Sequence, residues 1–380
     1  MRRALVVLLL LTSVNAGAQV AHLLIPAGSP EDKALQAINA EDDTQKRIPM
    51  LQSFLQEFAG NPQAVIYGQW QLAQQYLDSG DIPKAMEYGQ KAVAGQPNNL
   101  ELLMFLASAA NKAKAYDVVV DCAVRGATAF NGLANETKPD GMSAELFADH
   151  IKAAQDPVRG SYEFLEVAGL NAMVAETNAK KRMGYIERYI GAFTGSRFQE
   201  QVMELGVSTL AELKDSARLL NFSEKALAAN PKSVTTLVVL SEAFGDSPDA
   251  AAGARAESYA RKALDLAKDP AIAPADAGQL RLYTGLAHSA LGYALLKQDK
   301  NVPAILELKT ATGDLKGQGD SYSAALYRLG FAYAKTGKLA EAKVALTELA
   351  AIQGPFQGPA RDLLNKVVAG AAKASTKRGR

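Results

Sequence analysis

Apolar side chains between Tyr67 and Pro97 recur at helical spacing in two stretches of similar length. A short polar segment, residues 78–81, separates the two stretches. Apolar residues three or four positions apart lie on one face of a helix, so each stretch predicts an amphipathic helix. Residues 67–97 therefore predict a helix–turn–helix hairpin.

Small and helix-breaking residues stand where such a hairpin requires them. Ala73 and Ala85 are small enough to let two helices approach closely where they cross. Gly80 can take the left-handed conformation that ends the first helix, Pro83 suits the first turn of the second helix, and Pro97 stops it. One hairpin cannot bury its apolar face alone, so we expect further hairpins stacked against it.

The same spacing returns along the chain. Residues 100–133 repeat residues 66–99 at an offset of 34 positions. Residues 285–318 and 323–356 repeat the pattern again, and weaker hairpins are predicted between 165 and 270. The positions that carry the two late repeats are Leu291, Gly292, Leu295, Ala304 and Leu308, and then Leu329, Gly330, Tyr333, Gly337, Ala342 and Leu346. In all, we expect six or seven hairpins.

This pattern resembles the tetratricopeptide repeat, a helix–turn–helix unit of 34 residues. The resemblance implies an all-α solenoid of helical hairpins, wound as a right-handed superhelix with a concave ligand groove. We expect an exported member of this family, of bacterial origin.

The chain divides by composition and similarity into six expected parts. Residues 41–47 resemble residues 176–182 at an offset of 135, which predicts two related helical blocks. The expected parts are a signal peptide (1–18), a linker (19–29), an N-terminal repeat block (30–133), a connector packed on the solenoid (134–160), a C-terminal repeat block (161–371) and a basic disordered tail (372–380).

The first residues predict export. Two arginines at positions 2–3 precede an apolar run at 5–11, and Ala16-Gly17-Ala18 forms a small-residue cleavage site. A transmembrane helix needs about 20 apolar residues, and this run is shorter. We therefore expect a mature chain that begins near Gln19 and is periplasmic or secreted.

Little in the sequence indicates chemistry. The single cysteine, Cys122, lies among small apolar residues at helical spacing and is expected to be a buried packing residue. His22, His150 and His288 have no partner at i+3 or i+4, so no metal site is predicted, and His288 is expected to pack or to contact the groove. No phosphate-binding loop or G-x-S-x-G motif is present. We expect no cofactor and no catalysis. A net charge of +1 argues against a nucleic-acid partner.

The resemblance also implies where a partner binds. In this family, contact residues project from the first helix of each hairpin, at positions that the packing pattern leaves unused. Mapped onto this chain, they are Trp70, Gln74, Asp78, Met104, Ser108, Asn111, Tyr293, Lys297, Tyr327, Phe331 and Lys335. Aromatic residues and methionine recur among them, as in recognition surfaces, although packing against the next repeat is the competing interpretation. The early positions depart from the lysine and asparagine set with which some members hold a terminal carboxylate, so an apolar or mixed peptide is favoured.

Three functions follow as hypotheses. The leading one is a non-catalytic, monomeric module that binds a partner protein or peptide in the concave groove, in the cell envelope or outside the cell. The second is a periplasmic scaffold or chaperone for outer-membrane, pilus or polysaccharide assembly, which would run at high mass in native extract. The third, an enzyme with a degenerate site in the groove, lacks a segment that could serve as a catalytic module.

Overall fold

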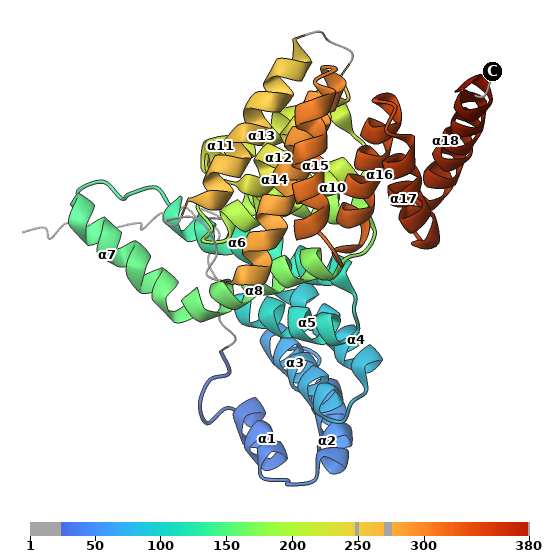
Figure 1. Cartoon of the computed structure of the whole chain (residues 1–380). Coiled ribbons are helices and arrows are strands. Elements are labelled where there is room, and N and C mark those ends of the chain that lie inside the picture. Colours follow the sequence, from blue (N-terminus) through green and yellow to red (C-terminus); the bar gives the residue numbers. More distant parts are fainter. Residues whose placement is uncertain (1–23, 248–250, 270–275, 379–380) are drawn as a thin grey trace, which may run out of the picture. The chain divides into compact units, whose positions relative to one another are not determined.

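The computed structural model describes residues 24–247, 251–269 and 276–378, and side chains as far as residue 370. Within these residues the chain forms helices and turns and no strand (Figure 1). The helices are α1 (Pro30–Asn39), α2 (Thr44–Glu57), α3 (Pro62–Asp78), α4 (Ile82–Gly95), α5 (Leu100–Lys112), α6 (Tyr116–Ala134), α7 (Ala144–Gln155), the 3-10 helix η1 (Asp156–Val158), α8 (Arg159–Ala175), α9 (Ala179–Ala192), α10 (Gln199–Glu212), α11 (Ser216–Ala229), α12 (Val234–Gly245), α13 (Ala252–Lys268), α14 (Ala277–Lys297), α15 (Asn301–Asp314), α16 (Gly319–Lys335), α17 (Leu339–Ala351) and α18 (Gln357–Arg378).

The expected all-α array of helical hairpins is confirmed. In the described part of the chain, six consecutive pairs pack along their length: α3/α4, α5/α6, α10/α11, α12/α13, α14/α15 and α16/α17. The pairs α1/α2 and α8/α9 touch more sparsely. For α8 the reason is that it packs mainly against α6 and α5. This agrees with the expected six or seven hairpins.

The chain forms two compact units, residues 1–198 and 199–380. The expected block boundaries at 133/134 and 160/161 both fall inside the first unit, which contains α1–α9. The expected signal peptide lies outside the described residues, as does the first part of the expected linker, residues 19–23.

Side-chain caps set the helix ends of the early hairpins. The Asn61 carboxamide oxygen accepts hydrogen bonds from the amides of Gln63 and Ala64 at 3.1 and 3.3 Å, so α3 begins at Pro62, earlier than the pattern predicted. Gly80 has φ of +81° in the turn after α3, as expected for a left-handed position. The next residue, Asp81, caps α4.

Small residues stand where the paired helices cross. Ala73 and Ala85 are fully buried. At Gly292 and Gly330 there is no room for a side chain: an added Cβ would lie 2.6 Å from Leu308 and 2.8 Å from Leu346, respectively. The expected repeat register is therefore confirmed at these positions.

The connector between the early repeats and α8 is only partly packed. Its helix α7 buries no side chain. The residues that follow α7 do pack, because Val158 and the ring of Tyr162 lie against Phe130 and its neighbours at the end of α6. Cys122, in α6, is buried as expected, and burial raises the pKa of its thiol to about 12.

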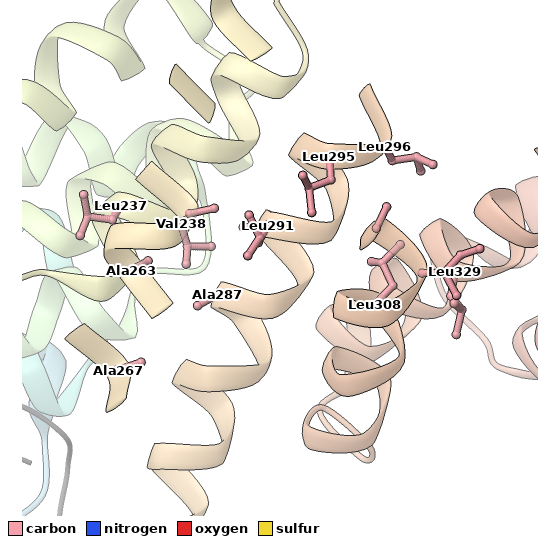
Figure 2. Close-up of a cluster of buried hydrophobic side chains, with 14 of the residues drawn as sticks. Leu237, Val238, Ala263, Ala267, Ala287, Leu291, Leu295, Leu296, Leu308 and Leu329 are labelled. Carbon is pink, nitrogen blue, oxygen red and sulfur yellow. The ribbon is translucent and has the colours of Figure 1, made fainter. Parts of the chain in front are cut away.

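In the second unit, one apolar cluster joins five helices (Figure 2). Val238 of α12 and two alanines of α13 face α14, which contributes Leu291 and Leu295, and Leu237 belongs to the same cluster. Leu308 of α15 and Leu329 of α16 continue the cluster. A hairpin array is stabilised by such shared interfaces, since each hairpin buries its neighbour's apolar face.

The last helix is longer than the pattern predicted. The expected C-terminal block ends at 371, whereas α18 continues to Arg378 through residues of the expected tail. Alanine, lysine and arginine there favour helix, and no proline or glycine interrupts them before Gly379.

Candidate functional site: an aromatic cavity in the second unit

A cavity of about 500 Å³ lies between α14, α16 and the turn that precedes α18. We call it the aromatic cavity. It is lined by Tyr293, Leu296, Lys297, Asp299, Tyr327, Arg328, Phe331, Lys335 and Phe356. All five contact residues expected in the late repeats are among them.

Helical spacing places these residues on two facing rows. Tyr293 and Lys297 are four positions apart on α14, and Tyr327, Phe331 and Lys335 follow the same spacing on α16. Residues four apart lie on one face of a helix, so each helix contributes one wall. The packing positions Leu291, Gly292 and Gly330 between them are buried, which leaves these rows free to face the cavity.

Aromatic rings form the apolar part of the lining. The rings of Tyr327 and Phe356 lie 5.8 Å apart at an angle of 39°. Phe331 is 40% exposed, an unusual position for so large an apolar side chain. An exposed aromatic beside a recess is a typical anchor site for a partner's side chain.

Arg328 is a cation held in place by Tyr293 of the lining and by two neighbours outside it. Its guanidinium carbon lies 4.3 Å from the centre of the Tyr293 ring. It forms an ion pair with Glu242 at 2.7 Å and donates a hydrogen bond to the Ser289 hydroxyl at 3.0 Å. The charge of Arg328 is therefore largely committed within the protein.

The hydroxyl end of the Tyr293 side chain is held in place as well. Its hydroxyl donates a hydrogen bond to Asp246. Burial raises the pKa of Tyr293, and the hydrogen bond to the Asp246 carboxylate raises it further, while Arg328 opposes the shift. The phenol is thus neutral, and its ring orientation is fixed before any ligand binds.

The two lysines of the cavity differ in their partners. Lys335 forms an ion pair with Asp299. Lys297 is exposed, with its ammonium 5.7 Å from the centre of the Tyr293 ring, and no carboxylate partner is recorded for it among the described residues. Lys297 is therefore the cation most available to a ligand.

The six early contact residues lie in the first unit, on α3 and α5. Trp70 is partly buried and meets Tyr67 edge to face at 5.8 Å. Its indole N–H is buried and has no hydrogen-bond partner in the described structure. Gln74, Met104 and Ser108 are half-buried, and Asp78 and Asn111 are exposed. A binding role for these six residues stays a prediction.

Sequence reasoning missed four members of the lining. Arg328 follows Tyr327 directly, but the offset of 38 positions between the two late repeats pairs it with Ala290, so the repeat pattern offers no signal for it. Leu296 and Asp299 adjoin the predicted Lys297 at the end of α14. Phe356 comes from the turn before α18, where no helical periodicity marks it.

The two histidines in the described part of the chain each have one carboxylate neighbour. His288 Nδ1 lies 2.6 Å from Glu307, between α14 and α15, and His150 lies 3.3 Å from Glu136. His22 lies outside the described residues. Among the described residues, no three His, Cys, Asp or Glu side chains gather as a metal site would require.

None of the described helices combines the length and apolar character needed to cross a bilayer.

Comparison with known proteins yields fold-level likeness alone. No family model matches the chain, and no curated protein matches it. Among solved structures, a thermophilic TPR protein of Thermus thermophilus is 17% identical, with a TM-score of 0.38, over 54% of this chain and 99% of that one. The apo form of RapI is 12% identical, with a TM-score of 0.36, over 75% of this chain and 76% of that one. Similarity at this level carries no argument about function, so the assignment of the fold rests on the helix pairing described above.

Proposed function

We propose that this chain is a non-catalytic interaction module that captures a segment of a partner protein in the aromatic cavity. The observation that supports the proposal most strongly is that the contact residues expected in the late repeats meet in one cavity. Five residues selected from two repeats by their position in the helical pattern line one cavity, together with four further residues. Packing alone does not require Phe331 and Lys297 to remain exposed there.

The lining defines the chemistry of the segment. Rings of Tyr327, Phe331 and Phe356 favour an apolar or aromatic side chain as the anchor. Lys297 favours a carboxylate near that anchor, because its charge has no acidic partner in the described structure. Arg328 and Tyr293 are held by other contacts, so little side-chain ordering is needed when a ligand binds.

The place of action follows from the predicted leader. Residues 2–18 have the pattern of a secretory signal, and we propose that the mature chain acts outside the cytoplasm, in the periplasm or after secretion. A segment exposed by an envelope or secreted protein is the corresponding partner.

A pull-down with a matched control tests the proposal. The bait is the chain from Gln19 to Arg380, compared with the variants Phe331→Ala and Phe164→Ala. Both phenylalanines are 40% exposed, but Phe164 lies on α8 in the first unit. We expect a protein that binds the wild type and Phe164→Ala and is lost with Phe331→Ala.

Two other results of the pull-down would contradict the proposal. Equal recovery with all three baits would remove the aromatic cavity from the binding surface. Loss with both variants would indicate nonspecific adsorption to exposed rings.

A further inference from the structure

Helix α16 carries a second row of side chains on the face opposite the aromatic cavity. Tyr322, Leu326, Leu329 and Tyr333 follow helical spacing and form the floor of a recess of about 490 Å³ between α15 and α17. At about 100° per residue, this row lies roughly half a turn around α16 from Phe331. We call the recess the α15/α17 groove.

The two walls of the groove carry opposite charges. Lys309 of α15 and Lys316 of the turn that follows α15 lie on one wall, seven positions apart in the sequence. Glu341 and Glu348 lie on the α17 wall, also seven residues apart. Seven residues are two helical turns, so Glu341 and Glu348 of α17 face the same way, about 10 Å apart.

These charges are not satisfied across the groove. No ion pair is recorded in the described structure for Lys309, Lys316, Glu341 or Glu348, although Glu348 accepts a hydrogen bond from the Tyr322 hydroxyl. The groove therefore offers two lysines and two glutamates to a ligand.

An apolar side chain lies exposed between the acidic positions. Val344 of α17 lines the groove and is 70% exposed. On α15, Val302 and Leu306 continue the line of Lys309 toward the start of the helix at spacings of four and three residues, and both are exposed. Apolar surface flanked by charge is typical of a helix-binding groove.

We propose that the α15/α17 groove binds an amphipathic helix of a partner protein, with an apolar seam, an acidic edge toward Lys309 and Lys316, and a basic edge toward Glu341 and Glu348. The floor from Tyr322 to Tyr333 spans about 16 Å, or three helical turns. This site is separate from the aromatic cavity and does not depend on the function proposed for it.

The seven-residue spacing of Glu341 and Glu348 on α17 favours a helix over an extended segment. A helix presents one edge to the same wall every seven residues while its seam stays on the floor. In an extended strand, residues about 10 Å apart are three positions apart and point to opposite sides, so they cannot both face one wall.

Three synthetic helices provide the test. Each has about 15 residues and the same leucine seam; one carries glutamates on one edge and lysines on the other, one carries glutamates on both edges, and one carries lysines on both. A peptide with its edges exchanged is not a control, because it can bind in the reverse direction. Binding to the full chain is measured by fluorescence anisotropy. We expect the mixed helix to bind at least tenfold more tightly than either single-charge helix.

Variants decide whether the groove is responsible. In Lys309→Glu/Lys316→Glu both walls are acidic, so the preference should change to the helix with two lysine edges. Val344→Asp should weaken the mixed helix about tenfold, whereas Phe331→Ala should leave it unchanged. The proposal is overturned if the mixed helix has no advantage, if no helix binds, or if the preference survives the reversal of the lysine wall.

Discussion

The guanidinium carbon of Arg328 lies 4.3 Å from the centre of the Tyr293 ring, and this contact joins α16 to α14. The same group pairs with Glu242, so one side chain connects α12, α14 and α16. The aromatic cavity is thus built on a cross-repeat contact that stabilises the second unit and orients the ring at the same time.

Replacement of Arg328 by alanine should destabilise the second unit by about 2 kcal/mol, since a cation–π contact and a charged hydrogen bond are lost together. Chemical unfolding followed by circular dichroism measures the change. Trp70, the sole tryptophan, lies in the first unit, so its fluorescence should report an unchanged transition there. Arg361→Ala, at an exposed arginine with one long hydrogen bond, should stay within about 0.5 kcal/mol of the wild type. Equal effects of the two substitutions would contradict a structural role for Arg328.

Replacement of Gly330 by alanine should cost about 1–3 kcal/mol, because the new Cβ would lie 2.8 Å from two carbons of Leu346. The matched substitution is Gly184→Ala in α9, where an added Cβ meets nothing within 4 Å. That change should stabilise its helix by about 0.5–1 kcal/mol. Thermal unfolding of both variants shows whether each substitution lowers or raises the stability. A neutral Gly330→Ala would mean that the α16/α17 crossing is looser than its contact with Leu346 indicates.

Tyr322 should make stability fall in alkaline solution. Burial raises the pKa of Tyr322 to about 12, and the hydrogen bond to Glu348 acts in the same direction. The unfolded chain then loses this proton near the ordinary tyrosine value of about 10, while the folded chain keeps it, so the contribution is complete below about pH 10 and is lost as pH rises through about 12.

The variant Tyr322→Phe should lack this part of the alkaline loss. At pH 7 it should be less stable by about 0.5–1.5 kcal/mol, because one hydrogen bond is missing, and the difference from wild type should shrink above pH 10. Urea unfolding at several pH values measures it. A difference that stays constant with pH would exclude the proton linkage.

Replacement of Glu166 should destabilise the first unit, because this carboxylate is buried in α8. The Ser196 hydroxyl donates a hydrogen bond to it at 2.7 Å, and Arg197 pairs with it at 3.4 Å. Truncation to alanine leaves the buried Ser196 hydroxyl without this acceptor and should cost about 1–3 kcal/mol. Glu163→Ala, on the exposed side of α8, is the control and should change stability by less than about 0.5 kcal/mol. Trp70 fluorescence during urea unfolding follows the first unit, and similar midpoints for the two variants would count against the Glu166 contacts.

Charge reversal at Lys297 should weaken partner binding about tenfold, or about 1.4 kcal/mol, if the segment bound in the aromatic cavity carries a carboxylate. Lys262→Glu makes the same change in net charge at an exposed position of α13 away from the cavity lining. Titration of the partner recovered by pull-down measures both affinities. Equal weakening by the two variants would point to long-range attraction and not to contact with Lys297.

Local patterns in the sequence were enough to predict the hairpins, and the resemblance to the tetratricopeptide repeat selected five of the residues that line the cavity. The spacing of Leu72, Ala73 and Ala85 predicted a crossing that the structure contains. The four-residue spacing of Tyr327, Phe331 and Lys335 placed them on one face of α16, because a helix has 3.6 residues per turn. The observed end of a helix differs from the expected one where a side-chain cap sets it, as at Asn61, the N-cap of α3.

The sequence by itself thus determined the helices, their pairing within the hairpins and the faces they present, since each depends on residues within one hairpin. The tertiary structure alone decided which charges remain without partners and which distant side chains meet. Phe356 joins the aromatic cavity from a turn, Arg328 reaches Glu242 across 86 positions, and the lysine and glutamate walls of the α15/α17 groove face each other over α16. No local periodicity encodes these relationships, because they depend on how one hairpin is placed on the next, which is set by the packing of many side chains together.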